Sequence, residues 1–446
     1  MYFTQNQEQK NSDVPVSLIQ ILSATQFKKK ERSGIPKSVF DLADQILCDI
    51  RKDGIVSVIQ YTKQFDGIDL NQNTIKISKE DIESASSKLS VVQKQAIDEA
   101  YFRVERAQGA IAKNALLETR ISIGDGYVLL RSRAIERVGI YVPGGRAPLP
   151  SSLLMAGVTA RAAGVKDIVV CTPPQKDGNL SPAILYVAQK LKISNIYQIG
   201  GAQAISAMAC GLPGILEKVD MICGPGNVYA AAAKQIVSSQ SLVKIDLAAG
   251  PSEVLIIADE TGNSKFIAAD MLAQAEHGIN SPAILLTSSK NLAQKVSKEL
   301  ELQLENLKPN EIAKQSIKNF GAIVLVSDVE EAIELANDYA PEHLEVFVRY
   351  PEIVAKKLTN AGAIFINTCE SFADYGMSGG NHILPTGGSA KFLSGLSVYD
   401  FLVRTYVEFM SDKDQQELAK FTEVFAALEG LEAHSKAAGF RGVQNV

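Results

Sequence analysis

From about residue 138 onward, the chain alternates short runs of β-favouring apolar residues with alanine-rich stretches of helical character. A strand, a crossover helix and a second parallel strand form a βαβ unit, and successive units build a mostly parallel sheet that helices cover. The first series predicts strands at Val138–Val142, Asp167–Cys171, Ile196–Ile199 and Met221–Cys223, with helices at Ser151–Ala163, Leu180–Leu191 and Gln203–Ala209.

A second series of the same kind begins after a break near Gly250–Pro251. It predicts a helix at Lys265–Glu276 and strands at Glu253–Ala258, Ala283–Leu286, Ala322–Val326 and Ala363–Ile366. Two series of alternating strands and helices indicate an α/β protein with two halves.

The two ends of the chain are predicted to be mainly helical. Near the start, Phe40–Ile50 carries an apolar stripe at helical spacing that Gly54 would end, and Val91–Ala112 is a longer amphipathic run. A strand is expected at Tyr127–Arg133, and the C-terminal segment Phe401–Val446 is expected to be helical with a polar tail.

Composition excludes several classes of protein. At about 150 residues per domain, 446 residues indicate two to four domains. The formal net charge of −5 argues against a nucleic-acid surface. No apolar run approaches the roughly 20 residues of a membrane helix, and residues 1–13 lack the apolar core of a signal peptide. The sequence therefore predicts a cytoplasmic protein with neither nucleic-acid nor membrane partners.

The chain has only four histidines, and all of them lie after residue 270: His277, His343, His382 and His434. Histidine titrates near neutral pH and is the commonest metal ligand. Each of the four has a carboxylate or an amide nearby in the sequence, so together they predict one metal and acid–base site. The five cysteines are scattered without CxxC spacing, which argues against a disulfide framework or a cysteine-based zinc site.

Gln274 and His277 are three residues apart toward the end of the helix predicted at Lys265–Glu276. That spacing places both side chains on one helix face, where they could reach one ion. A neutral imidazole suits Zn²⁺, and an amide oxygen is a weaker ligand. The alternative is a helix end with an incidental histidine.

Glu342 and His343 follow Pro341, and proline favours the first position of a helix. A helix starting there would place both residues near the positive end of its dipole, which favours an ionised carboxylate and a neutral imidazole. Such a histidine could accept a proton and such a glutamate could activate water. The alternative is that Glu342 only complements the dipole.

The segment from Asp374 to His382 is too rich in glycine for a helix and is predicted to be a loop that brings these two residues to one place. An ordinary turn is the alternative. Glu429 and His434 lie in the C-terminal segment, which must then dock on its own chain or on a partner subunit.

Three glycine-rich loops lie at strand-to-helix junctions of the first series: Pro143–Gly145, Gly200–Gln203 and Gly224–Asn227. Exposed backbone N–H groups at the start of a helix bind anions, so a dinucleotide is plausible there. None of the loops fits GxGxxG, and tight turns without a ligand explain them equally well.

Taken together, these segments resemble the histidinol dehydrogenase family over nearly the whole chain. The resemblance is carried, in order, by Val138–Pro150 (VGIYVPGGRAPLP), Gly200–Ala204, Gly224–Asn227, Asp246–Ala258 (DLAAGPSEVLIIA), Gln274–Gly278, Tyr339–Glu345, Asp374–Gly388 and Glu429–His434. The loop from Asp374 to His382 is longer than in the family pattern.

The resemblance implies oxidation of L-histidinol through the aldehyde to L-histidine, with two NAD⁺ and a zinc ion. It implies Glu342 and His343 as the acid–base pair and three residues at the NAD site: Tyr141, Gln203 and Asn227. The implied zinc ligands are Gln274, His277, Asp374 and His434. The substrate would also contact Ser252, His382 and Glu429, besides His343 and the zinc ligands.

The family's fold implies two α/β domains with incomplete Rossmann-like sheets, together with small terminal helical segments. By this pattern, residues 39–140 and 254–396 form the zinc and catalytic domain, and residues 141–253 form the NAD domain. Residues 1–38 form an N-terminal helical segment, and residues 397–446 form a tail that crosses a homodimer and brings Glu429 and His434 to the partner's site. Three alternatives remain: the same fold acting on another small alcohol, a metal-dependent hydrolase using Glu342, and a binding protein without turnover.

Overall fold

The computed structural model describes residues 18–29, 34–144, 147–247, 250–367 and 374–442. The chain divides into two compact units. Unit 1 comprises Met1–Cys48, Pro225–Ile236 and Leu247–Gly395, and unit 2 comprises Asp49–Gly224, Val237–Asp246 and Leu396–Val446. Within the described residues, no helix is both long and apolar enough to span a membrane.

Unit 2 is built on a five-stranded parallel sheet in the order β6-β5-β4-β7-β8. Four of its strands confirm the first predicted series, and the short β8 was not predicted. The strands are β4 (Arg137–Tyr141), β5 (Asp167–Cys171), β6 (Asn195–Tyr197), β7 (Met221–Cys223) and β8 (Lys244–Ile245). The intervening helices of this unit are α6 (Pro150–Ala162), α7 (Pro182–Lys190) and α8 (Gly201–Cys210). Helix α9 (Val228–Ser239) follows β7 in the chain, but its residues up to Ile236 belong to unit 1.

Unit 1 contains a six-stranded parallel sheet in the order β1-β11-β10-β9-β12-β13. Its strands are β1 (Gln20–Ser23), β9 (Val254–Ala258), β10 (Ala283–Thr287), β11 (Ala322–Leu325), β12 (His343–Phe347) and β13 (Ala363–Phe365). Counted from β4 and from β9, the unit 2 sheet and five strands of the unit 1 sheet run 3-2-1-4-5, the Rossmann order without its last strand. In unit 1, β1 adds a sixth strand beside β11. The prediction of two incomplete Rossmann-like sheets is therefore confirmed.

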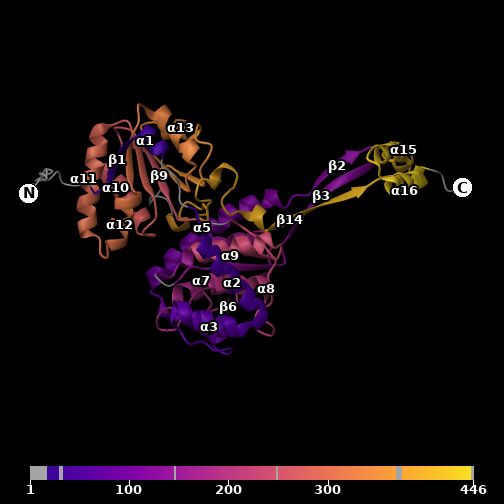
Figure 1. Ribbon diagram of the computed structural model, residues 1–446, viewed down its shortest axis with the longest axis horizontal. Coiled ribbons are helices and arrows are strands. Elements are labelled where there is room, and N and C mark those ends of the chain that lie inside the picture. Colours follow the sequence, from indigo (N-terminus) through magenta and orange to yellow (C-terminus); the bar gives the residue numbers. More distant parts are fainter. Residues whose placement is uncertain (1–17, 30–33, 145–146, 248–249, 368–373, 443–446) are drawn as a thin grey trace, which may run out of the picture. The chain divides into compact units, whose positions relative to one another are not determined.

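Helices cover both faces of the unit 1 sheet (Figure 1). All of β9 is buried, as expected of a central parallel strand. Its residues alternate between two cores: Val254 and Ile256 pack with helices α10 to α12, whereas Leu255 and Ile257 pack with α1 and α13. The helices of this unit are α1 (Ala24–Lys28), α10 (Ser264–Ala275), α11 (Lys290–Asn306), α12 (Glu311–Phe320), α13 (Val329–Tyr339) and α14 (Pro351–Ala355). Its 3-10 turns are η2 (Asp374–Gly376) and η3 (Ser389–Lys391).

The two helices predicted near the start of the chain are confirmed as α2 (Lys37–Asp53) and α5 (Val91–Ala115). Between them lie α3 (Ile55–Asp66), α4 (Lys79–Ser84) and the 3-10 turn η1 (Ala85–Lys88), which were not predicted individually. Gly54 separates α2 from α3 with a φ of 57°, which explains why the first helix stops there. Residues 49–140 belong to unit 2, whereas the family pattern assigns them to the catalytic domain. One reason is that Ile77 and Gln198 make backbone hydrogen bonds which join residues 75–77 to the end of β6.

Two predictions for the chain ends were wrong. Residues 20–23 form strand β1, because they complete the sheet edge beside β11. Residues 402–409 form strand β14 (Leu402–Phe409), which follows η4 (Val398–Phe401) and pairs antiparallel with β3 (Gly126–Ala134). Backbone pairing with β3, rather than burial of side chains, stabilises this strand, since most side chains of β14 are exposed.

Strand β2 (Thr119–Ile123) completes a three-stranded sheet with β3 and β14. Figure 1 shows this sheet leading to two packed helices, α15 (Asp412–Leu428) and α16 (Glu432–Gly442). The turn between β2 and β3 meets the start of α15, where the Asp125 backbone N–H donates to Asp414 at 2.8 Å. The C-terminal helices are thereby fixed to the end of this sheet.

Candidate active site

The predicted acid–base pair lies at the amino edge of the unit 1 sheet. Ser252 and Glu253 directly precede β9, and Glu342 directly precedes β12, which begins at His343. Because β9 and β12 are parallel neighbours with His343 opposite Val254, these residues meet at one edge. Helix α10 leads to the same edge, since a parallel crossover returns the chain to the start of the next strand.

The prediction that a helix opens at Pro341 was wrong. Helix α13 ends at Tyr339, Ala340 has a φ of 50°, and His343–Phe347 form a buried strand. Parallel pairing with both β9 and β13 outweighs the local preference of proline for a helix start. The helix-dipole argument for the ionisation of Glu342 and His343 therefore does not apply.

The Glu342 carboxylate is buried, with 7% of the residue exposed. Its Oε2 accepts a hydrogen bond from Ser252 Oγ at 2.7 Å and another from the Glu253 backbone N–H at 3.0 Å. Burial raises the pKa of Glu342 to about 8, and the two hydrogen bonds oppose that rise. A carboxyl group with such a pKa can hold or release a proton near neutral pH.

The His343 imidazole is held in one tautomer. Its Nδ1 lies 2.9 Å from the Glu253 backbone oxygen and 3.5 Å from Glu342 Oε2. A carbonyl oxygen can only accept, so Nδ1 of the neutral ring carries the proton and Nε2 keeps its lone pair. Burial lowers the pKa of His343 to about 4, so the ring is neutral at pH 7. Nε2 of His343 can therefore act as a base.

Gln274 and His277 lie at the end of α10. Gln274 is fully buried, and neither heavy atom of its amide head has a hydrogen-bond partner among the residues that the structure describes. Burial of the ring lowers the pKa of His277, and an electrostatic interaction with His343 adds to that lowering. This electrostatic interaction indicates that the end of α10 lies near the acid–base pair.

The loop after residue 374 runs along the same edge. Thr386 accepts a hydrogen bond from the Gly250 backbone N–H, and the Gly387 N–H donates to Glu253 Oε1 at 3.1 Å. His382 is half-buried and lies four residues before Thr386. Asp374 begins the 3-10 turn η2, while residues 368–373, including Cys369, lie outside the described residues.

Glu429 and His434 belong to unit 2 and are both exposed, Glu429 at the end of α15 and His434 in α16. Within the described ranges, no three or more histidine, cysteine, aspartate or glutamate side chains of this chain group so that they could hold a metal. The predicted zinc ligands would not form such a group within one chain, because one of them is an amide and another is a histidine from a second subunit.

Two of the residues expected at a dinucleotide, Tyr141 and Gln203, lie at the carboxyl edge of the unit 2 sheet, whereas the third, Asn227, belongs to unit 1. Tyr141 ends β4, and its hydroxyl accepts a hydrogen bond from the Gly201 N–H at the start of α8 at 3.0 Å. Gln203 lies in the same helix, 1% exposed, and its Oε1 has no hydrogen-bond partner among the described residues. Asn227 caps α9 by accepting from the backbone N–H groups of Tyr229 and Ala230.

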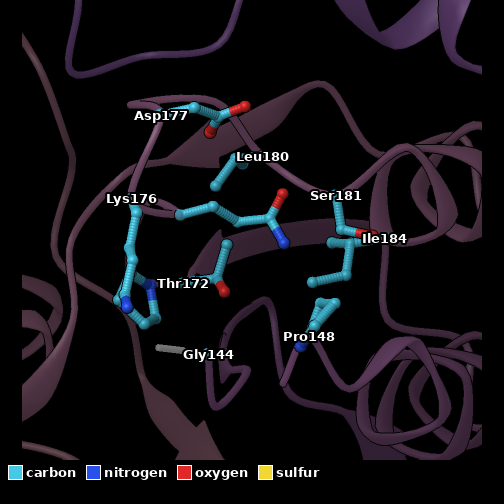
Figure 2. A pocket seen from close by; sticks show the side chains of 10 residues that line it. Gly144, Pro148, Thr172, Lys176, Asp177, Leu180, Ser181 and Ile184 are labelled. Carbon is cyan, nitrogen blue, oxygen red and sulfur yellow. The ribbon is translucent and has the colours of Figure 1, made fainter. Parts of the chain in front are cut away.

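A cavity of about 330 Å³ opens at the carboxyl ends of β4 and β5 (Figure 2). Gly144, Thr172 and Ser181 are among the residues that line it. Thr172 is fully buried, and its hydroxyl has no hydrogen-bond partner within the described part of the chain. In Rossmann-type sheets, ligands bind at this edge.

The helix starts differ between the two units. In unit 1, the helices that follow β9, β10 and β11 are capped by the side chains of Asn263, Ser289 and Asp328. In unit 2, Ser181 caps α7 in the same way, whereas α6 and α8, which starts after Gly200, have no side-chain cap among the described residues. Uncapped N–H groups at a helix start favour an anion, so the start of α8 suits an anion better than the capped helix starts of unit 1.

Sequence reasoning missed two residues of this arrangement. Glu253 is 2% exposed, and its carboxylate accepts a hydrogen bond from the Tyr339 hydroxyl at 2.9 Å. Both lie inside segments that carry the family resemblance, but neither was given a role. The signal that could have found Glu253 is a carboxylate at the start of an otherwise apolar buried strand.

The buried pair makes the stability of the metal-free protein depend on pH. Between pH 7 and 8, folded Glu342 keeps most of its proton, whereas an unfolded glutamate has lost it; His343 is neutral in the folded state and mostly neutral in the unfolded state. The folded state then binds more protons, so the free energy of unfolding should fall by about 1 kcal/mol as pH rises across that range. Below pH 7, His343 increasingly opposes this trend, because only the unfolded chain protonates it.

Denaturant unfolding of the chelator-treated protein and of Glu342→Gln at pH 6.5 and 8.5 measures this effect. The variant keeps an acceptor for Ser252 and the Glu253 N–H but cannot ionise, so it should become more stable relative to the wild type as pH rises. An identical pH dependence in both proteins would contradict the raised pKa.

Comparison with known proteins gives a consistent result. A family model described as histidinol dehydrogenase matches residues 29–442. A histidinol dehydrogenase of Lactococcus lactis subsp. lactis is 40% identical over 444 residues, covering 97% of this chain and 99% of the relative. One from Clostridium acetobutylicum is 42% identical over 409 residues, covering 91% and 92%. The crystal structure of histidinol dehydrogenase from Elizabethkingia anophelis, 37% identical, matches with a TM-score of 0.87 over 96% of this chain and 98% of that chain.

Proposed function

Because the chain belongs to the histidinol dehydrogenase family of oxidoreductases, we propose that it oxidises L-histidinol through L-histidinal to L-histidine, using two NAD⁺ and a zinc ion. The observation that supports this most strongly is the buried pair of Glu342 and His343, with the base nitrogen of His343 fixed by one backbone carbonyl.

In the first oxidation, His343 Nε2 takes the proton of the substrate hydroxyl. Its neutral state at pH 7 and its single available lone pair suit this step, because a base must be unprotonated when the substrate arrives. The Glu253 carbonyl stabilises the imidazolium that forms, since Nδ1–H already points toward it.

In the second oxidation, Glu342 takes a proton from the water that attacks the aldehyde. Ser252 Oγ and the Glu253 N–H hold Oε2, which leaves Oε1 as the oxygen we assign to that water. Because the pKa of Glu342 is about 8, this step uses the ionised fraction of the carboxyl group, which grows as pH rises toward 8, and the protonated form can return the proton afterwards.

We propose Gln274, His277, Asp374 and His434 of a partner subunit as the zinc ligands. A buried amide without partners costs free energy until a ligand uses its lone pairs, so the unpartnered head of Gln274 fits an ion. The lowered pKa of His277 keeps its ring neutral, as a ligand must be. When bound, the zinc would orient the imidazole and amine of the substrate, beside which Ser252, His382 and a partner's Glu429 would complete the substrate site.

For NAD⁺, which supplies the hydride acceptor when bound, we propose the carboxyl edge of the unit 2 sheet. Tyr141 and Gln203 line the start of α8 there, and the unpartnered Gln203 Oε1 and Thr172 hydroxyl offer polar atoms to a ligand. Asn227 at the start of α9 is the third residue that we assign to the dinucleotide.

We propose that the protein is a homodimer in which α15 and α16 reach the partner's site. These helices expose large apolar side chains: Phe421, Val424, Phe425, Leu428 and Phe440 are each more than 60% exposed. An exposed apolar patch of this kind is typical of a protein–protein interface. A cytoplasmic location remains a prediction from the sequence.

The direct test is to incubate the purified protein with L-histidinol and NAD⁺ and follow NADH by its near-ultraviolet absorbance. We expect about two NADH for each L-histidinol consumed, because each carbon oxidation releases one hydride. One NADH per turnover, or faster oxidation of a small alcohol without an imidazole, would contradict the proposal. Hydrolysis without NADH would instead favour a metal-dependent hydrolase.

A further inference from the structure

Both members of the acid–base pair bind to the backbone of one residue, Glu253. Its N–H donates to Glu342 Oε2 at 3.0 Å, and its carbonyl oxygen accepts from the His343 backbone N–H at 3.3 Å and from Nδ1 at 2.9 Å. The orientation of the two peptide groups flanking the Glu253 Cα therefore determines both the position of Glu342 and the tautomer of His343.

The side chain of Glu253 is anchored from two other parts of unit 1. The Tyr339 hydroxyl, at the end of α13, donates to Oε2 at 2.9 Å, and the Gly387 N–H donates to Oε1 at 3.1 Å. Each carboxylate oxygen thus has a donor of its own. Because the residue is 2% exposed, water cannot readily replace either bond.

We propose that Glu253 is a positioning residue: its carboxylate, held by Tyr339 and Gly387, fixes the backbone groups that keep His343 in the Nδ1–H tautomer and Glu342 in place. The significance for turnover rests on the function proposed above, whereas the effect on the His343 tautomer follows from the hydrogen bonds alone. The acid–base pair is thereby supported by α13 and the loop near residue 387 as well as by β9.

Three substitutions separate this role from general stability. Glu253→Gln has nearly the same shape, and its amide can accept from the Gly387 N–H while donating to the Tyr339 oxygen. Glu253→Ala removes the anchor, and Tyr339→Phe removes only one of its bonds. Tyr186→Phe is the matched control, because its hydroxyl also donates to a carboxylate, Asp98, at 3.0 Å, but in unit 2.

The readout is ¹⁵N NMR of histidine-labelled protein, in which four histidines give few signals and His343→Gln assigns that of His343. We expect the Nδ1–H tautomer in the wild type, Glu253→Gln and Tyr186→Phe, and a mixture of tautomers in Glu253→Ala. Tyr339→Phe, which should fold even if Glu253→Ala does not, should show a smaller shift toward the mixture. In kinetics, Glu253→Ala should lower kcat about tenfold or more with little change in KM for L-histidinol, because the base is misplaced while binding is kept.

An Nε2–H tautomer in the wild type would overturn the proposal. So would an unchanged His343 signal in both folded Glu253→Ala and Tyr339→Phe. If the protein did not oxidise L-histidinol at all, the proposed function would fail, but the NMR comparison would still decide whether Glu253 positions His343.

Discussion

Replacing His343 with glutamine is expected to lower kcat for L-histidinol by about 10³-fold, within the range typical of losing a general base. Glutamine is similar in size, and its amide can still donate to the Glu253 carbonyl, but it has no nitrogen that accepts a proton at neutral pH. The buried setting leaves little room for water to take over the role. Steady-state production of NADH at saturating substrate measures the loss.

Metal analysis of the purified variants separates loss of the base from loss of the metal. His343→Gln should keep the zinc content of the wild type, whereas His277→Ala should lose most of its zinc together with its activity. Circular dichroism would check that both variants are folded. If His277→Ala retained its zinc, the assignment of His277 as a zinc ligand would be wrong. Turnover near the wild-type rate in His343→Gln would rule out His343 as the base.

Pairing an inactive His434→Ala chain with an inactive His343→Gln chain is expected to restore about half of the wild-type activity per dimer. In a two-fold symmetric dimer with shared sites, one site then receives both faulty residues and the other receives neither. Co-expression with two different affinity tags, followed by purification on both, isolates this mixed dimer. Its NADH production is compared with that of the two parent homodimers.

A mixed dimer made from two His343→Gln chains with different tags is the matched control, and it should remain inactive. No recovery in the mixed dimer of the two variants would show that α16 serves the site of its own chain. Gel filtration or light scattering of each sample checks that dimers formed, since the exposed apolar side chains of α15 and α16 are expected to be covered only in the dimer.

The parallel strands could be predicted from the sequence wherever they are short, mainly apolar and almost entirely buried, as β5, β9 and β10 are. Strand β12 escaped prediction because it begins with His343 and contains Glu345, although both are buried. Strands β1 and β14 also escaped, because their partners lie far away in the sequence and most of their side chains are exposed. In these strands, pairing in the tertiary structure outweighs the local pattern.

The candidate site could be predicted in its residue types but not in its geometry. The isolated acid–base motif identified Glu342 and His343, yet it suggested a helix start and an ionised carboxylate, whereas burial raises the pKa of Glu342. The tautomer of His343 depends on a carbonyl 90 positions earlier in the chain, which no local pattern reveals. The roles of Tyr141, Gln203, Asn227, Gln274, Asp374, His382 and Glu429 remain predictions from the family resemblance.

The matching 3-2-1-4-5 strand order of the two sheets is what duplication of one ancestral gene would leave behind. On that history the two copies specialised at opposite edges. One copy kept a glycine start for its helix at the carboxyl edge, while the other closed that edge with Asn263, Ser289 and Asp328. The second copy then gained its chemistry at the amino edge, where Ser252, Glu253, Glu342 and His343 lie. The oldest part of the protein would then be the edge that we propose for the dinucleotide, and the proposed acid–base pair a later acquisition.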